Sequence, residues 1–484
     1  MTCFISGVRV RPFASLFTLF SLLSWAVADD IQVNVDCAQV VDRPLVLTGY
    51  FNNSLRNAPP PALAEKTEDA YGRPKIVRCW LVLDQMWDYR TGEYRFNWQI
   101  GKNYYEGDKV KHPYERDKAM LSEVMFEDYL SAFGEHSQEI LLNVRRYEQE
   151  VRKGIISMSK WKEVLKTGLA HYKKEYPNIR YIEALNESRF PHFGGVPPQD
   201  YYKFFKVVTE VVNEINAELD PELPLLIGGS ADHHAKGILP LVKGYANDQD
   251  PNKRLDFVSF HEYWVGKEPV QVAGWERQVA GILKAHGVPA DIPIYVTEIA
   301  YALPKSDPKF NLHQAAGMTA ILYQARHAEQ LRLFPWVMYH TPQQKALVMF
   351  DNHLRMTPFG AAVKMLSMHK EKEVFSQSSG LTKAGTGLGA LATRDESGVA
   401  VQVWNYQESP ASVQVTIQNV PEQLAEDDLK VRHYLIDSKH SNCFSDSSSK
   451  GGLDSFRETR QEHAEDVQLS VQLEPMALHL WIIE

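Results

Sequence analysis

Between about residue 45 and residue 370, short apolar runs alternate with longer stretches of helical periodicity. Each run is rich in β-branched and aromatic residues and is apolar almost throughout, which is typical of parallel strands that are covered on both faces. The eight runs are LVLTGYF, IVRCWLVL, EILLNVR, RYIEALN, PLLIGGS, DFVSFHEYW, IPIYVTEIA and PWVMYH.

The stretches between the runs predict amphipathic helices. Residues 200–219 have apolar side chains at positions 201, 204, 205, 208, 211, 212 and 215, the spacing of a helix with one buried face. Residues 161–172 repeat this pattern, and residues 274–287 end in a glycine that suits a helix stop. Eight strands that alternate with helices predict an α/β fold, a (β/α)8 TIM barrel over residues 47–370.

Residues 371–484 have a different pattern. Period-two segments punctuated by Gly, Pro, Asn and Asp predict an antiparallel β-sandwich domain at the C-terminus. These segments are GALATRD, GVAVQVWNY, ASVQVTIQNV, KVRHYLID, DVQLSVQLE and MALHLWIIE. The run IQVNVD, within residues 29–46, alternates in the same way, and we expect this N-terminal strand to join the sandwich as an edge strand.

Residues 1–28 have the pattern of a cleavable secretory signal peptide. Arg9 and Arg11 precede an apolar stretch, and the small residues AVA at 26–28 precede Asp29. A membrane anchor is the alternative, but the stretch is short for a span and no later run is long enough. We therefore expect a secreted, extracellular protein with no membrane partner.

Charge and cysteine content argue against a nucleic-acid-binding protein and against a zinc site. The net charge is −9 and no block of Lys or Arg stands out, so we expect no nucleic-acid partner. After signal cleavage, Cys37, Cys79 and Cys443 remain, which allows at most one disulfide and fits no zinc motif. Asn52, in the triplet NNS, is a candidate glycosylation site.

Two glutamates fall where a barrel places its chemistry. Glu187 follows the fourth run and Glu298 lies near the end of the seventh, and active sites of TIM barrels sit at the carboxyl ends of the strands. An isolated Asn-Glu pair is more often a cap or a turn. Two strand-end carboxylates facing one cavity, however, are what glycoside hydrolysis requires, with one acid to protonate the leaving oxygen and one nucleophile.

Neighbouring residues suggest distinct roles for the pair. The amide of Asn186 can donate a hydrogen bond to a sugar hydroxyl, plausibly the 2-OH, that strengthens in the transition state. Glu298 must stay ionised as a nucleophile, and Arg78 and Tyr263 are candidate donors to it. We expect burial and the charge of Glu298 to raise the pKa of Glu187, so that it starts protonated as the acid/base.

Together, ALNES, FVSFHEYW, IYVTEIAY, PWVMYH and YLIDSKHSN resemble the glycoside hydrolases of family 39, across most of the mature chain. That resemblance implies a retaining clan A (β/α)8 barrel with an appended β-sandwich. We expect no cofactor. It implies that Glu187 is the acid/base, Glu298 the nucleophile and Asn186 the partner of the 2-OH. It also implies that His261 and Tyr263 line the −1 subsite over an apolar floor formed by Trp336.

One departure from the family concerns the loop after the fourth run. The family commonly has Pro after the Asn-Glu pair, whereas Ser188 and Arg189 follow here. Arg189 and His192 could bind an acidic sugar or lie in solvent. The expected substrate is an oligo- or polysaccharide or a glycoside, such as a β-xyloside or related β-glycoside, with the sugar at −1 left open.

Other polar residues have less specific interpretations. His233 and His234 lack the helical i, i+4 spacing of common zinc sites, so we expect no metal. Arg145 and Arg146 are interpreted as structural ion-pairing groups. The alternatives to a hydrolase are a catalytically inactive secreted carbohydrate-binding protein, which would usually lack one carboxylate, and a transglycosylase that uses the same residues.

Overall fold

The computed structural model describes residues 30–53, 55, 58–100, 123–302, 306–339, 342–421, 424, 429–445, 451–453, 455–461 and 466–484. The predicted signal peptide, residues 1–28, lies outside the described residues. Within this described part, no helix is both long enough and apolar enough to cross a membrane.

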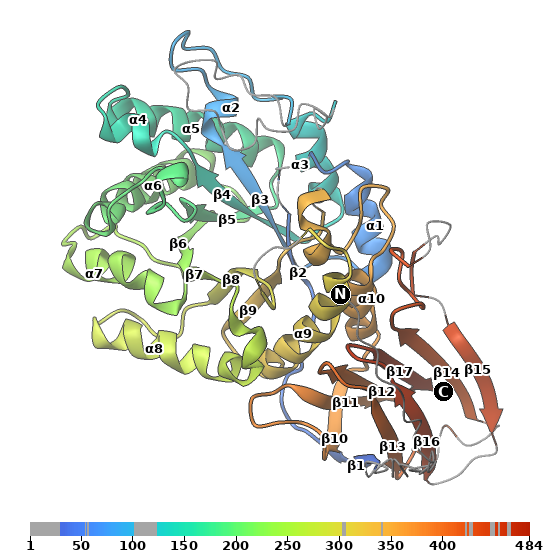
Figure 1. The fold of residues 1–484 in the computed structure, drawn as a ribbon. Coiled ribbons are helices and arrows are strands. Elements are labelled where there is room, and N and C mark those ends of the chain that lie inside the picture. Colours follow the sequence, from blue (N-terminus) through green and yellow to red (C-terminus); the bar gives the residue numbers. More distant parts are fainter. Residues whose placement is uncertain are drawn as a thin grey trace, which may run out of the picture.

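Eight parallel strands, hydrogen-bonded in chain order, form a barrel (Figure 1). They are β2 (Tyr50–Asn52), β3 (Ile76–Val82), β4 (Glu139–Arg145), β5 (Ile179–Ala184), β6 (Leu226–His233), β7 (Phe257–Glu262), β8 (Ile294–Ile299) and β9 (Leu331–Pro335). Just beyond the last strand, the backbone N–H of Met338 donates to the carbonyl of Asn52 at 3.0 Å, which brings the two ends of the sheet together. The predicted TIM-barrel fold is confirmed.

Helices surround this sheet and bury the faces that the periodicity predicts. The α-helices are α1 (Ala62–Tyr71), α2 (Leu83–Met86), α3 (Phe126–Glu135), α4 (Glu148–Arg152), α5 (Met158–Glu175), α6 (Pro198–Leu219), α7 (Leu239–Asn247), α8 (Trp275–Ala285), α9 (Phe310–Ala325) and α10 (Pro358–Ser367). Ser157 caps α5 by accepting the N–H of Lys160 at 3.1 Å, and α6 begins at consecutive prolines. Local capping and one apolar face therefore determine where these helices begin and what they cover.

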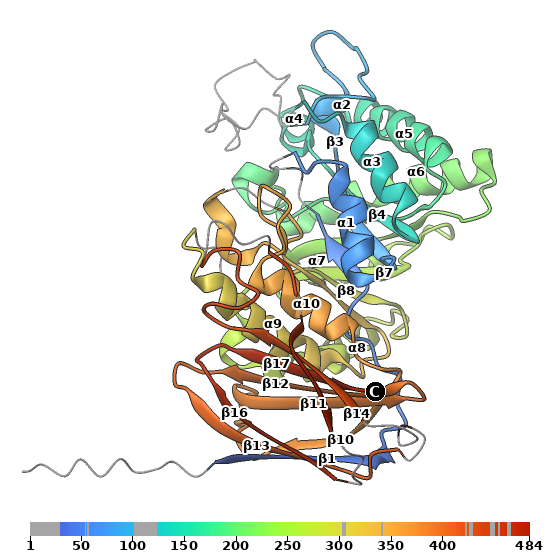
Figure 2. The same cartoon turned by 90° about the vertical axis from the view of Figure 1, so that its right-hand side faces the viewer.

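The second sheet has nine strands, mostly antiparallel, and curls into a sandwich-like unit beside α9 and α10 (Figure 2). It contains β1 (Ile31–Val40), β10 (Lys372–Ser378), β11 (Gly387–Asp395), β12 (Gly398–Tyr406), β13 (Ala411–Gln418), β14 (Leu429–Ile436), β15 (Ser455–Gln461), β16 (Val467–Leu473) and β17 (Leu478–Ile483). Strand β1 joins the sheet but lies inside it, between β10 and β13, and pairs in parallel with β13, so the expected edge position was wrong. The predicted sandwich fold is confirmed.

Several local expectations were wrong. In the first run only Tyr50–Asn52 forms a strand, and the last barrel strand ends at Pro335, so Trp336 lies just beyond it. Strands β10 and β15 were not predicted, because their alternation is interrupted by polar residues on both faces. Asn52 is fully buried, so its side chain is not accessible for glycosylation in the folded chain.

Inside the barrel, side chains are stacked in layers because alternate residues of each strand point inward. The lowest layer is a plug of large apolar and aromatic side chains, namely Tyr50, Ile76, Leu141, Tyr181, Phe257, Tyr295 and Phe334. Gly228 of β6 makes room for it, since an added Cβ would lie 2.3 Å from the carbonyl oxygen of Phe257 and 2.5 Å from its ring. The plug closes this end of the barrel and leaves the carboxyl ends of the strands for a site.

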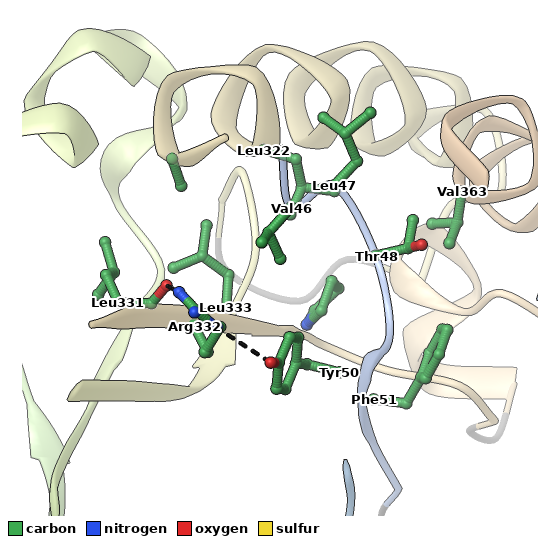
Figure 3. Close-up of a pocket in the computed structure, with 12 residues that line it drawn as sticks. Val46, Leu47, Thr48, Tyr50, Phe51, Leu322, Leu331, Arg332, Leu333 and Val363 are labelled. Carbon is green, nitrogen blue, oxygen red and sulfur yellow. Dashed lines mark hydrogen bonds between the residues drawn. The ribbon is translucent and has the colours of Figure 1, made fainter. Parts of the chain in front are cut away.

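A small cavity lies outside the plug, between β2, β9 and the helices α9 and α10 (Figure 3). Its volume is about 20 Å³ and apolar side chains such as Leu322, Leu333 and Val363 line most of it. The guanidinium of Arg332 donates to the hydroxyl of Tyr50 at 3.0 Å on its wall. A space of this size holds about one water molecule, so it is a packing gap at the barrel seam and not a substrate site.

The space around two glycines predicts opposite effects of their substitution on stability. Gly228→Ala forces a methyl group into Phe257 and should destabilise the barrel by about 1–3 kcal/mol or more. Gly281→Ala, inside α8 with open space around its Cβ position, should stabilise it by about 0.5–1 kcal/mol. Calorimetric melting temperatures test this, and a Gly228→Ala protein that melts with the wild type would contradict the layered packing.

Candidate active site

Glu187 and Glu298 meet at the carboxyl end of the barrel. A carboxylate oxygen of each and a ring nitrogen of His261 all lie within 4.8 Å of one another, and all three residues are buried. Glu187 lies in the loop shortly after β5, the fourth barrel strand, and Glu298 lies in β8, the seventh. The structure therefore brings the two predicted carboxylates together over the polar interior of the barrel.

The backbone at Glu187 is unusual. Leu185 and Glu187 have φ angles of 62° and 46°, in the left-handed region that costs a non-glycine residue on the order of 1 kcal/mol or more. The N–H of Glu187 donates to the carbonyl of Ala231, near the end of β6, at 2.9 Å. Ser188 allows this conformation, whereas the proline of the resembling family would favour extended backbone at Glu187.

A fully buried guanidinium supports the base of the site. From β3, Arg78 donates through Nη1 to Glu298 Oε1 at 2.8 Å and through Nη2 to Asn186 Oδ1 at 2.7 Å. Its Nε donates to Glu183 Oε2 at 2.8 Å. Burial alone would lower the pKa of Arg78, but the charges of Glu183 and Glu298 outweigh it and raise the pKa. Arg78 thus fixes the nucleophile candidate and the amide at the same time.

Glu183 is a component that the sequence analysis did not identify. It points into the barrel from β5 and also accepts hydrogen bonds from Asn143 Nδ2 at 2.8 Å and Thr297 Oγ1 at 2.7 Å. Burial raises its pKa, but the charges of Arg78 and His261 and the hydrogen bonds from Ser259 and Thr297 together outweigh burial, and the pKa is lowered. The available signal was a lone carboxylate in an otherwise apolar strand, two residues after Tyr181 of the plug and therefore on the inward face.

Both oxygens of Glu298 are engaged by donors. Oε1 accepts from Arg78, and Oε2 accepts from the hydroxyl of Tyr263, which follows β7, with His261 Nδ1 3.6 Å from the same oxygen. Burial and the negative charges of Glu298 and Glu187 raise the pKa of Tyr263 far above its ordinary value, so its hydroxyl remains a donor. Glu298 therefore has a hydrogen-bond donor on each oxygen, which fixes the orientation of its side chain.

Glu187 has two histidine partners on one oxygen. His261 Nδ1 lies 2.8 Å and His233 Nε2 lies 3.0 Å from its Oε1. Burial raises the pKa of Glu187, but the hydrogen bonds from His233 and His261 outweigh it and lower the pKa below its usual range. The expected raised pKa was therefore wrong. That expectation rested on burial and on the charge of Glu298. The contact with His233 comes from a separate strand, β6, and has the opposite effect on the pKa of Glu187.

Trp336 forms an aromatic wall next to the two carboxylates. It is buried, stacks on Trp80 with ring centroids 6.3 Å apart, and meets the ring of Tyr263 edge-on at 6.4 Å. The guanidinium of Arg145 lies over the rings of Trp80 and Phe193, at 4.5 Å and 4.6 Å. Trp80 thus supports the predicted apolar floor from behind.

The remaining candidates lie at the rim or are engaged elsewhere. Arg189 Nε pairs with Asp232 Oδ1 at 2.9 Å, and Trp264 is 59% exposed just after β7. His234 Nδ1 lies 2.7 Å from Glu262 Oε2. Cys37, Cys79 and Cys443 are buried free thiols.

A metal fits this site poorly. Among the described residues, Glu187, His261 and Glu298 are the one group of three or more whose potential ligand atoms converge. The permanent positive charge of Arg78 lies 2.8 Å from Glu298, and Tyr263 occupies its second oxygen. A divalent cation would have to displace both donors and accept the repulsion of the guanidinium.

Comparisons with known proteins identify the fold. No protein-family model matches the chain, and no curated protein matches it in sequence. The chain is similar in structure to a GH39 enzyme from Xanthomonas axonopodis pv. citri, with a TM-score of 0.67, 14% identity and coverage of 94% of this chain and 98% of that one.

Two further structures are similar to the same extent. A monomeric beta-xylosidase from Caulobacter crescentus CB15 has a TM-score of 0.66, and a glucosidase from Croceicoccus marinus has one of 0.64. Each is 14% identical and covers 94% of this chain and 99% of its own. The combined barrel and sandwich fold expected from the family 39 resemblance is therefore confirmed.

The buried charge network predicts a stability effect. Glu183→Gln removes one partner of a fully buried ion pair and should destabilise the barrel by about 3–5 kcal/mol, because Arg78 loses a compensating charge. The matched control Glu163→Gln breaks an exposed pair with Lys160 and should change stability by less than about 1 kcal/mol. Urea unfolding followed by tryptophan fluorescence measures both. Equal midpoints for the two variants would show that the pair is energetically unimportant.

Proposed function

We propose that this chain is a retaining glycoside hydrolase that cleaves O-glycosidic bonds by double displacement. The observation that supports this most directly is the approach of oxygens of Glu187 and Glu298 to within 4.8 Å. Retaining enzymes hold their two carboxyl groups about 5–5.5 Å apart, whereas inverting enzymes leave about 6.5–9.5 Å for a water molecule. The pair here leaves room for a sugar carbon between the groups but not for an additional water.

In the first step, Glu298 attacks the anomeric carbon while Glu187 donates its proton to the leaving oxygen. A bond forms between the glutamate oxygen and the carbon, the glycosidic bond breaks, and the leaving group departs as an alcohol. Arg78 and Tyr263 keep the attacking carboxylate ionised and oriented. Because Arg78 donates to Oδ1 of Asn186, the Nδ2 of that amide is free to point toward the 2-OH of the sugar.

In the second step, Glu187 acts as a base. It takes a proton from water as the water oxygen bonds to the anomeric carbon, and Glu298 leaves as a carboxylate. The hydrogen bonds from His261 and His233 that lower the pKa of Glu187 favour this base form. The same residues therefore serve both half-reactions, with the proton on Glu187 alternating between them.

The proposed substrate is a β-xyloside or a related β-glycoside, and the proposed location is outside the cell. Similar structures are named as a beta-xylosidase and a glucosidase, which favours a neutral sugar. The positive charge of Arg189 is already compensated by Asp232, which weakens the case for an acidic sugar as the substrate. Secretion rests on the signal-peptide pattern of residues 1–28.

An inactive carbohydrate-binding protein is a poorer account of this site. A protein that only binds sugar needs no carboxylate held by two donors. Burying Arg78 between Glu183 and Glu298 has a desolvation cost, and such buried charge clusters are more typical of catalytic sites. The complete set of carboxylates and their supporting donors therefore favours catalysis.

Retention of configuration is directly measurable. A panel of β-configured aryl xylosides and glucosides should be cleaved, and proton NMR of the reaction within the first minutes should show the β-anomer of the free sugar before mutarotation. A first product in the α-form would contradict double displacement.

The two glutamates should differ in their response to substitution. Glu298→Gln should reduce kcat by about 10⁴-fold or more on every substrate, because no covalent intermediate forms. Glu187→Gln should retain the first step on dinitrophenyl glycosides, because their leaving group needs no acid. Azide, which needs no general base, should restore the second step and give a glycosyl azide as the product. Burst kinetics distinguish the steps, and equal losses in both variants without azide rescue would refute the assigned roles.

A further inference from the structure

His233 stands apart from the other residues around Glu187. It ends β6 and its side chain is 17% exposed, whereas His261 is fully buried. Both imidazoles approach the same carboxylate oxygen, Oε1, at 3.0 Å and 2.8 Å. Within the described part of the chain, Oε2 of Glu187 accepts no hydrogen bond, so it is the oxygen free to face a leaving group.

The two histidines have different freedom to gain a proton. Nε2 of His261 is buried without a hydrogen-bond partner among the described residues, so placing a second proton there would leave an unsatisfied charged donor. Among the described residues, the ring of His261 is therefore engaged through Nδ1 alone. His233 donates through Nε2 and keeps an exposed part of its ring, so it can take up and release a proton with solvent.

We propose that His233 and Glu187 act as a coupled pair with one exchangeable proton, and that His233 is the positioning residue that determines the pH range of the acid/base. When the proton is on Oε2 of Glu187, His233 is neutral and still donates to Oε1, and the pair is ready to act as an acid. When the proton is on His233, Glu187 is a carboxylate and a base. This inference rests on the proposed glycosidase function.

The charged surroundings of His233 agree with such a pair. The titratable and charged groups that face it come from the loop after β5, from β6, from β7 and its loop, and from β8: Glu187, Arg189, Asp232, His234, His261, Tyr263 and Glu298. Arg189 pairs with Asp232 and Arg78 pairs with Glu298, so Glu187 is the carboxylate that contacts His233 directly. Burial lowers the pKa of His233, but these carboxylates, Glu187 first, outweigh it and raise the pKa above 6.5.

The pair makes a specific prediction for the pH profile. For a substrate with a poor leaving group, kcat/KM falls at high pH as the shared proton is lost, and in the wild type that loss follows the raised pKa of the pair. His233→Gln keeps an N–H donor but cannot titrate. The alkaline limb should then move to lower pH by about one unit or more, toward the pKa of Glu187 alone.

Two controls separate titration from a structural effect. His234→Gln changes the neighbouring imidazole, which pairs with Glu262 and not with Glu187, and should leave the limb within about 0.3 pH units of the wild type. With a dinitrophenyl glycoside the first step needs no acid, so the position of the alkaline limb of kcat/KM should be the same in His233→Gln and in the wild type. A His233→Gln profile that matches the wild type on the poor leaving group would overturn the proposal.

A second measurement requires no turnover. In NMR titrations with labelled histidine, assigned by comparison with His233→Gln, the His233 imidazole should have a pKa above 6.5 that falls by about one unit or more in Glu187→Gln. An unchanged His233 titration would overturn the pair. If the NMR coupling is present and no glycoside in the panel is cleaved, the pair stands and the proposed hydrolase function fails.

Discussion

The guanidinium of Arg78 is the buried charge around which the upper half of the barrel is organised. Arg78 itself lies on β3. It donates to Glu183 on β5, to Asn186 just after β5 and to Glu298 on β8, so it connects three strands of the barrel. Each carboxylate would be costly to bury alone, and so would the guanidinium. Because Arg78, Glu183 and Glu298 compensate one another, the barrel can hold these three groups in an interior that otherwise favours neutral side chains.

The layers below Arg78 explain why the site has one open end. The aromatic plug closes the barrel at the amino ends of the strands, and Gly228 lets Phe257 fill the last gap in it. Polar side chains begin only above the plug, at the inward positions of Arg78, Asn143, Glu183 and Thr297. The plug is thus a rigid base, and the residues at the strand ends are supported by interactions from beneath and not only by loops.

Sequence periodicity was sufficient for the architecture and for the two carboxylates, because barrel strands have a strong apolar signal and a fixed site at their carboxyl ends. It failed where a residue's role depends on its neighbours across strands. Glu183 and His233 are two such residues, since their partners Arg78 and Glu187 are distant in sequence. The expectations of a raised pKa for Glu187 and of a glycosylation site at Asn52 were wrong for the same reason. Both properties depend on contacts and burial that a single segment of sequence does not determine.

The central claim is that Glu298 is the nucleophile opposite Glu187. Trapping with 2-deoxy-2-fluoro-β-xylosyl and -glucosyl fluorides tests it directly, because the fluorine slows both steps while the good leaving group lets the intermediate accumulate. Peptide mass spectrometry of the inactivated protein should locate one fluorosugar on Glu298 and none on the Glu298→Gln protein. A fluorosugar attached to Glu187, or to any carboxylate outside this site, would contradict the account.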